Sequence, residues 1–202
     1  MENATDHIAG DRNRILKAAL DEFATCGLVD ASIESIAKRA NVAPGAARAL
    51  FLDKATMLRD VLAEATGPMV SAIALAVEEI EEPKAFLRKS LQLYDQWLLL
   101  NPQIVKLLIR CLLDGEESLQ MLYQQTLLPS DFYERLGQLI ENRHVRCGDI
   151  FTFSLLLDSL VIFPHALRSA LPLMNPEKSA EESLDIRFEA VIDLLEKGLF
   201  RE

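Results

Sequence analysis

Apolar residues recur every three to four positions through most of the chain, and no segment shows the strict apolar–polar alternation that predicts a β-strand. The first apolar stretch covers one face of a helix and stops at Cys26-Gly27, because glycine commonly ends a helix. The residues of this face are Ile15, Leu16, Ala19, Leu20 and Phe23. The pattern predicts an all-α protein with about nine helices.

The stretch that follows predicts two short helices joined by a tight turn. Ser32 is a suitable N-cap for a helix that runs through Arg39. Asn41 tolerates the left-handed conformation that such a turn often needs. Pro44 fits the first turn of the next helix, where its missing N–H costs nothing, and Asp53 then caps a fourth helix.

Proline and glycine divide the rest of the chain. Gly67-Pro68 breaks or kinks the helical pattern, and we place a domain boundary there. The last two segments, residues 149–171 and 176–200, are the most apolar, and Pro164 is expected to kink the first of them. Residues 1–10 are expected to be a flexible N-terminus. The other expected breaks are Glu82-Pro83, Asn101-Pro102, Asp114-Gly115, Pro129-Ser130-Asp131, Cys147-Gly148 and Leu171-Pro172.

Charge is distributed unevenly along the 202 residues. The formal net charge of -10 excludes a protein coated with basic surface. Residues 12–59 nevertheless hold eight Lys or Arg against five Asp or Glu, a net charge of +3, whereas residues 67–202 hold 13 against 21, a net charge of -8. Any contact with nucleic acid is therefore expected to be local and near the N-terminus.

The cysteines and the apolar segments indicate a cytoplasmic protein. The three cysteines are widely spaced and fit neither a disulfide framework nor a zinc pattern, so reduced thiols are expected. The first ten residues contain no apolar stretch typical of a signal peptide. The run IFTFSLLLDSLVIF is short and contains Asp158, so it predicts a buried helix and not a membrane span.

No pattern of an enzyme or a metal site is present. The sequence has no nucleophile elbow and no phosphate-binding glycine loop, and its three histidines lack metal-ligand spacing. His165, on an apolar segment, is interpreted as a satisfied core or interface residue. We expect no catalytic residue, no metal and no cofactor.

The segment from Arg14 to Leu62 has a motif spacing that extends over four expected helices. It matches I-x-x-A-A-x-x-x-F-x-x-x-G, T/S-x-x-x-I-A, A-G-V-S-x-G-x-x-Y-x-H-F and K-x-x-L. The matching positions are Ile15, Ala18, Ala19, Phe23, Gly27, Ser32, Ile36, Ala37, Ala40, Val42, Gly45, Phe51, Lys54 and Leu58. This segment resembles the DNA-binding domain of the tetracycline-repressor (TetR) family, whereas the remainder resembles that family only in length and helical character.

The resemblance implies a domain organisation and a function. Residues 11–66 would form a three-helix DNA-binding domain with the helix-turn-helix at 32–51, and residues 67–202 a helical domain for ligand binding and dimerisation. The protein would be a homodimeric repressor that binds a near-palindromic double-stranded DNA operator and responds to an unknown small-molecule effector. The alternative is a TetR-like fold that binds a small molecule or a partner protein without DNA.

The resemblance also implies a set of DNA contacts, with residues 43–50 as the recognition helix. Arg48 is its one long donor and suits a phosphate or a guanine edge. Lys54 resembles the phosphate-binding lysine of the family. The full set is Arg12, Arg14, Ser32, Ala43, Pro44, Gly45, Ala46, Arg48 and Lys54.

Three observations weaken this set. The recognition helix lacks polar residues, since Ala43, Ala46 and Leu50 stand where the family has Ser, Thr and His. Arg12 and Arg14 suit a solvated helix end equally well, and Glu34 is expected to face DNA unfavourably.

Two further sites follow from the second part of the chain. A ligand cavity is expected at Tyr94, Trp97, Arg110, Met121 and Tyr123, for which ordinary core packing is the alternative. Trp97 and Arg110 favour an anionic or aromatic ligand. A four-helix dimer interface is expected at Phe153, Leu157, Leu160, Val161, Phe188, Val191, Ile192 and Leu195.

Overall fold

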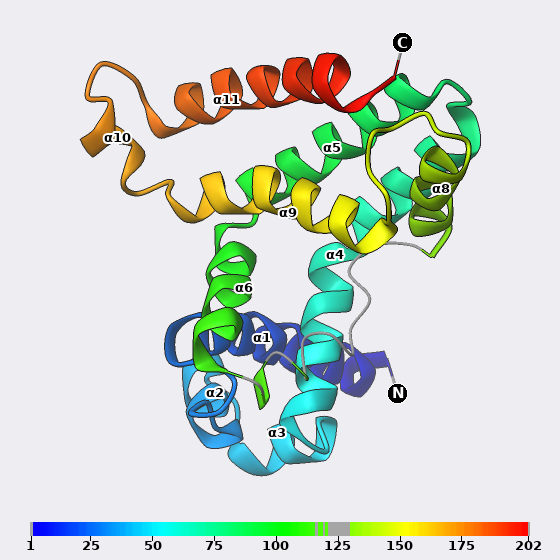
Figure 1. Ribbon diagram of the computed structural model, residues 1–202. Helices are drawn as coiled ribbons and strands as arrows, with labels where there is room; N and C mark the ends of the chain where they lie inside the picture. The colour runs from blue at the N-terminus through cyan, green and yellow to red at the C-terminus, as the bar shows by residue number, and fades with distance from the viewer. Residues whose placement is uncertain (1, 116, 119, 121–129, 202) are drawn as a thin grey trace. The chain divides into compact units, whose positions relative to one another are not determined.

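The computed structural model describes residues 2–115, 117–118, 120 and 130–201, and every regular element in these ranges is helical (Figure 1). They form ten α-helices and one π-helical turn, and one isolated bridge joins Val145 to Phe200. The predicted all-α class is confirmed. One unexpected helix is the short α10 (Leu171–Met174), where Leu171-Pro172 was expected to separate two helices; its proline lies in the first turn, which tolerates it.

Contacts divide the chain into two compact units. The first consists of Met1–Gly67 and Gln103–Leu127, and the second of Pro68–Pro102 and Leu128–Glu202. The first unit holds α1 (Glu2–Cys26), α2 (Ile33–Ala40), α3 (Pro44–Leu50), the first half of α4 (Lys54–Glu79), and α6 (Pro102–Asp114). The second holds the rest of α4, α5 (Pro83–Leu100), α8 (Ser130–Glu141), α9 (Ile150–Ala166), α10, α11 (Ala180–Leu194) and the π-turn Leu195–Leu199.

One division between the units falls at Gly67, but α6 belongs to the first unit, although the sequence boundary placed it with the second part. Pro68 does not interrupt α4. A proline removes one helical hydrogen bond, and beyond it Met69, Ile73 and Ala76 are buried, so packing compensates for the loss. The assignment of DNA binding and ligand binding to separate domains stays a prediction.

The ends of the first helices follow the sequence signals. α1 ends at Cys26, and Gly27 takes a φ of +88°, a conformation that glycine adopts without strain. Ser32 caps α2 in a reciprocal pair with Ser35, as predicted for an N-cap. Asn41 has a φ of 54° and is left-handed, as predicted. α1 begins at Glu2, so the helix extends into the residues expected to be a flexible N-terminus.

The core of the first unit lies beneath the predicted apolar face of α1. Ile15 and Phe23 are fully buried, together with Ile36 of α2, Ala47 of α3 and Leu58 of α4. Burial of this kind stabilises a helix far more than its own propensity does. α2 and α3 therefore pack on a core that they share with α1 and α4.

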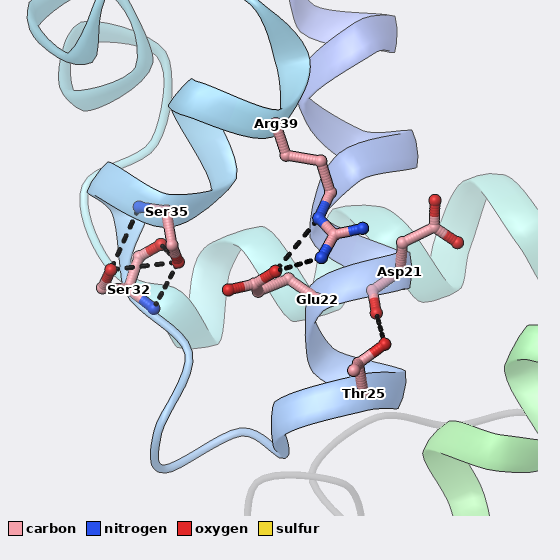
Figure 2. A network of polar contacts seen from close by, with 6 residues as sticks. All are labelled: Asp21, Glu22, Thr25, Ser32, Ser35 and Arg39. Atoms are coloured by element: carbon pink, nitrogen blue, oxygen red, sulfur yellow. Dashed lines mark hydrogen bonds and ion pairs between the residues drawn. The ribbon is translucent and has the colours of Figure 1, made fainter.

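A charged pair also fixes α2 to α1. Figure 2 shows Arg39 of α2 with its guanidinium directed at Glu22 of α1. Arg39 Nε and Nη2 lie 3.0 and 2.9 Å from the same carboxylate oxygen. The Glu22 carboxylate is nearly buried, so the two contacts provide the charge that its desolvation requires.

Among the described helices, α4 is long and apolar enough to cross a membrane by length and composition. Core helices meet the same two criteria. Met57, Leu58 and Val61 of α4 are buried within the first unit, and Met69 and Ile73 within the second. α4 is thus a partly buried core helix.

Candidate functional site

The helix-turn-helix is formed by α2 and α3 (Figure 1). Its turn is closed by the backbone: the N–H of Asn41 donates to Lys38 O at 3.2 Å and that of Val42 to Ala37 O at 3.0 Å. The left-handed Asn41 helps the chain to turn between α2 and α3 within three residues. α3 can therefore follow α2 at the short spacing that this motif requires.

The outer face of α3 is formed by small residues and one arginine. Ala47 and the following Phe51 are buried against the core, whereas Ala46 is half-buried. The exposed residues at its start and along this face are Ala43, Pro44, Gly45, Arg48 and Ala49. No side chain caps the helix at Ala43. Because these side chains are short, the backbone of α3 can approach a partner closely. Arg48 is the only charged group on this face.

Arg48 is paired within the chain. Its Nη2 contacts Glu34 Oε1 of α2, and both side chains are largely exposed. The backbone hydrogen bond at Glu34 and the hydrogen bond from Arg48 lower the pKa of this carboxyl. Glu34 was expected to oppose DNA, but the positive charge of Arg48 offsets its negative charge. Arg48 must in turn leave or share this carboxylate before it can contact a phosphate or a base.

The other predicted DNA contacts also have partners. Arg12 Nη2 lies 2.9 Å from Asp60 Oδ2, and its guanidinium lies 5.9 Å from the centre of the Phe51 ring. Arg14 contacts Asp11. The Ser32 hydroxyl caps α2 and so is occupied.

Lys54 has a structural role that the sequence did not indicate. Its Nζ donates to Leu28 O at 2.8 Å and to Val29 O at 2.7 Å, and it thereby ties the start of α4 to the turn after α1. Lys17 and Lys38 differ, because both are exposed and no residue whose side chain is described pairs with them. Together with the exposed Lys106 of α6, they are the cations of the first unit for which the described residues provide no partner.

The predicted ligand residues that the structure describes belong to two different units. Tyr94 and Trp97 are buried on α5, where their rings stack at 6.0 Å with an interplanar angle of 14°. Arg110 lies on α6 in the other unit, where its Nε is 2.7 Å from Asp114 Oδ1 and its Nη2 is 3.4 Å from Cys26 O. Arg110 thus already serves the end of α1, and a ligand site that includes it stays a prediction. The remaining two, Met121 and Tyr123, lie outside the described residues.

A small hollow of about 20 Å³ lies between α5, α8 and α9. Tyr94 lines it, but Trp97 does not. It has room for about one water molecule, whereas pockets for drug-sized ligands enclose roughly 300 Å³ or more. The lining residues are Leu91, Tyr94, Phe132, Tyr133, Leu136, Ser154, Leu157 and Asp158.

The residues predicted to form the dimer interface are mostly in the protomer's own core. Leu160 is half-buried, and the other seven are buried: Phe153, Leu157, Val161, Phe188, Val191, Ile192 and Leu195. The sequence pattern identified the apolar face of each helix but did not reveal that the chain itself covers it. The large apolar side chains that these two helices leave exposed are Ile150, Phe151, Leu155, Leu156, Phe163, Ile186 and Leu194.

A buried charged network ties α5, α9 and α11, which lie side by side (Figure 1). Asp95 Oδ1 is 2.9 Å from His165 Nε2 and 2.5 Å from Arg187 Nη2. Burial opposes ionisation of Asp95, but its bonds to His165 and Arg187 outweigh it and lower its pKa. The interpretation of His165 as a core residue is confirmed, but its partner Asp95 lies 70 positions away and carries no local signal.

No family model and no curated protein sequence matches this chain. Solved structures match it over nearly its whole length. A proposed fatty acid metabolism regulator from Clostridium perfringens is 19% identical, with a TM-score of 0.72 over 94% of this chain and 100% of that one. The TetR-family transcriptional regulator PfmR from Thermus thermophilus is 20% identical, with a TM-score of 0.64 over 95% and 98%.

The transcriptional regulator FadR from Bacillus subtilis, solved in complex with stearoyl-CoA, is 19% identical, with a TM-score of 0.68 over 92% of this chain and 97% of that one. The chain has the TetR fold. The three neighbours with the TetR fold are named as regulators and not as enzymes, in agreement with the absence of catalytic motifs from the sequence.

Proposed function

We propose that the protein is a cytoplasmic, ligand-responsive transcriptional repressor that binds DNA through α3. The observation that carries this proposal is the helix-turn-helix, whose second helix exposes a contact face (Ala43, Pro44, Gly45, Arg48) above a fully buried core. A recognition helix of this kind enters the major groove with its N-terminal residues toward the bases. The TetR fold of the whole chain supports the same function.

The proposed repressor is a homodimer. The exposure of several large apolar side chains on α9 and α11 supports this assembly, because such side chains are commonly covered in a protein–protein interface. They include Phe151, Leu155 and Phe163 of α9 and Ile186 and Leu194 of α11. A twofold axis would place two recognition helices about one DNA turn apart and match a near-palindromic operator.

The proposed effector is a small molecule that binds among the helices of the second unit. It would favour a spacing of the recognition helices that does not fit the operator, and only a difference in affinity between the two states has this effect. Bacillus subtilis FadR was solved with stearoyl-CoA, which supports a partly apolar ligand in this fold.

A salt titration of binding to genomic DNA fragments tests the proposal. Neutralisation of phosphates by cations releases counterions, so log Kd is expected to rise steeply with log salt for a protein that contacts several phosphates. A map of bound genomic sites would then identify the operator. A flat salt dependence, or no binding at low salt, overturns DNA binding.

A second candidate function is binding of a small molecule or partner protein without DNA. The observation that favours it is that Arg12, Arg14, Arg48 and Lys54 all have partners within the chain. Each would give up an ion pair or hydrogen bond to reach DNA, which lowers the net gain. The salt titration separates the two functions directly.

A further inference from the structure

One carboxylate in the second unit has no charged partner among the described residues. Asp158 of α9 forms no hydrogen bond or ion pair with any residue in the described ranges, whereas Asp95 in the same unit has two partners. It lines the hollow between α5, α8 and α9 and is an exposed residue. The carboxylate is therefore reachable from solvent but unsatisfied by the described part of the protein.

The surroundings of this carboxylate are aromatic and apolar. Tyr94 of α5, which is buried, and Tyr133 of α8, which is partly exposed, line the hollow with it, together with Leu91, Phe132 and Leu157. Removal of water by these side chains raises the pKa of Asp158 to about 6. Burial first, and the negative charge of Asp158 second, raise the pKa of both Tyr94 and Tyr133, so the two phenols stay neutral.

We propose that this hollow binds the cationic head of a small lipophilic amine, with Asp158 as its counter-ion and the rings of Tyr94 and Tyr133 against its apolar part. The inference rests on the proposed function in that the amine would be the effector. An ammonium group would supply the charge that no described side chain provides. Aromatic faces next to the carboxylate add a favourable cation–π contact.

The size and charge of the hollow narrow the ligand class. A volume of about 20 Å³ accepts a compact primary ammonium and little more, so the apolar part of the ligand must displace side chains or lie toward the open side. An anionic ligand would place its charge against Asp158 without a described cation to offset the repulsion. The expected charge of the ligand is therefore opposite to that of the anionic ligand that Trp97 and Arg110 suggested in the sequence.

Three probes of similar shape test the proposal: phenethylammonium, 2-phenylethanol and 3-phenylpropionate. Their binding to the full-length protein is measured by calorimetry and by fluorescence of Trp97, the only tryptophan, which stacks on Tyr94. We expect the cation to bind at least about tenfold more tightly than the alcohol, since a charge-assisted contact is worth that factor or more. The anion is expected not to bind.

Asp158→Asn should remove the preference for the cation, whereas Asp185→Asn, at an exposed position of α11, should keep it. The Asp158→Asn variant should melt no earlier than wild type at pH 7, because the raised pKa of Asp158 means that its negative charge is disfavoured in the folded state. Affinity for the cation should fall about tenfold from pH 7.5 to pH 5 as Asp158 protonates. Over this range Tyr94 and Tyr133, the titratable groups facing it, stay neutral.

Equal binding of the cation and the alcohol, an unchanged preference in Asp158→Asn, or no binding of phenethylammonium at millimolar concentration overturns the inference. Its failure is distinguishable from failure of the proposed function. DNA binding without binding of the cation overturns only the ligand class. Binding of the cation without DNA binding upholds the site and favours the second candidate function.

Discussion

At the scale of single residues, Arg48 and Lys54 have different surroundings despite their similar expected roles. Arg48 is paired with a side chain on an open surface, whereas Lys54 satisfies two backbone carbonyls. An exposed ion pair contributes little to stability, but a bond to an otherwise unpaired carbonyl contributes more. Substitution of Arg48 therefore tests DNA contact alone, whereas substitution of Lys54 affects DNA contact and folding together.

Replacement of Arg48 by alanine should weaken operator binding by about 1 to 3 kcal/mol and change the preferred sequences, if the guanidinium contacts a base. The free energy of unfolding should change by less than about 0.5 kcal/mol. Fluorescence anisotropy with a set of operator variants measures the first, and urea unfolding the second. Glu34→Gln is the matched control and should strengthen binding, because it releases Arg48 and removes an acid. Equally weak binding of DNA by wild type and Arg48→Ala at low salt would contradict a role of Arg48 in base recognition.

Replacement of Lys54 by alanine should reduce both DNA binding and stability. Loss of a phosphate contact should weaken binding to all sequences and lower the salt slope by about one unit. Loss of the bonds to Leu28 O and Val29 O should lower the free energy of unfolding by about 1 to 2 kcal/mol. Lys38→Ala, at an exposed position, is the control and should leave stability unchanged. An unchanged salt slope with reduced stability would make Lys54 purely structural.

Local residue signals were predictable from the sequence, whereas partners were not. Gly27, Ser32 and Asn41 act through their own backbone conformation or a neighbour three positions away, so composition and spacing reveal them. The partners of Arg12 and Lys54 lie 48 and about 26 positions away. Such pairs depend on tertiary packing, which no local pattern encodes.

At the scale of elements, the contact between α5, α9 and α11 depends on a charged centre within an apolar layer. Asp95 is nearly buried, compensates the charge of Arg187 and forms a hydrogen bond with His165. Arg187 Nη1 also donates to Leu160 O at 3.2 Å. Buried networks of this kind are costly when one member is removed.

Asp95→Asn should lower the free energy of unfolding by about 2 to 4 kcal/mol, because Arg187 loses its buried counter-charge. The folded-state pKa of Asp95 is below its ordinary 3.8, so its contribution is present above that value and lost as pH falls through the folded pKa. Urea unfolding at pH 7 and at pH 3 measures both effects, and the variant should lose less stability on acidification than wild type.

Glu189→Gln, which removes only an exposed partner of Arg88, is the control for that measurement and should change stability by less than about 0.5 kcal/mol. If Asp95→Asn is as stable as wild type at pH 7, the network does not hold the three helices together.

The positions of the helices were largely predictable from caps and apolar spacing, but the effect of Pro68 was not. Glycine followed by proline commonly marks an interruption, and α4 nevertheless runs from Lys54 to Glu79. The buried Met69 and Ile73 on the far side decide this outcome, and their burial depends on the second unit.

At the scale of the whole molecule, the apolar side chains that remain exposed define the expected assembly. Leu155→Glu on α9 and Leu194→Glu on α11 should turn a homodimer into a folded monomer at micromolar concentration, because each places a charge in the proposed interface. Light scattering measures the mass and circular dichroism the fold. Leu173→Glu, on the exposed α10, should leave the dimer intact.

Phe153→Glu distinguishes the interface from the core, since Phe153 is fully buried within the protomer. This variant should unfold instead of dissociating, because a charge would be buried without a partner. A wild-type protein that is monomeric at micromolar concentration, or a Phe153→Glu variant that is a folded monomer, would contradict the expected assembly.

The close approach of α6 to Gly27 limits how the chain can be recombined with others. A Cβ at Gly27 would lie 2.1 Å from Asp114 Oδ2, and Arg110 on the same helix reaches the carbonyl of Cys26. Residues 1–67 therefore do not form a complete structural unit by themselves, because Gln103–Leu127 belongs to the same unit. A hybrid regulator built by grafting this N-terminal part onto a foreign effector domain must also transplant Gln103–Leu127, or bring a donor helix whose side chains leave the same opening for the left-handed glycine.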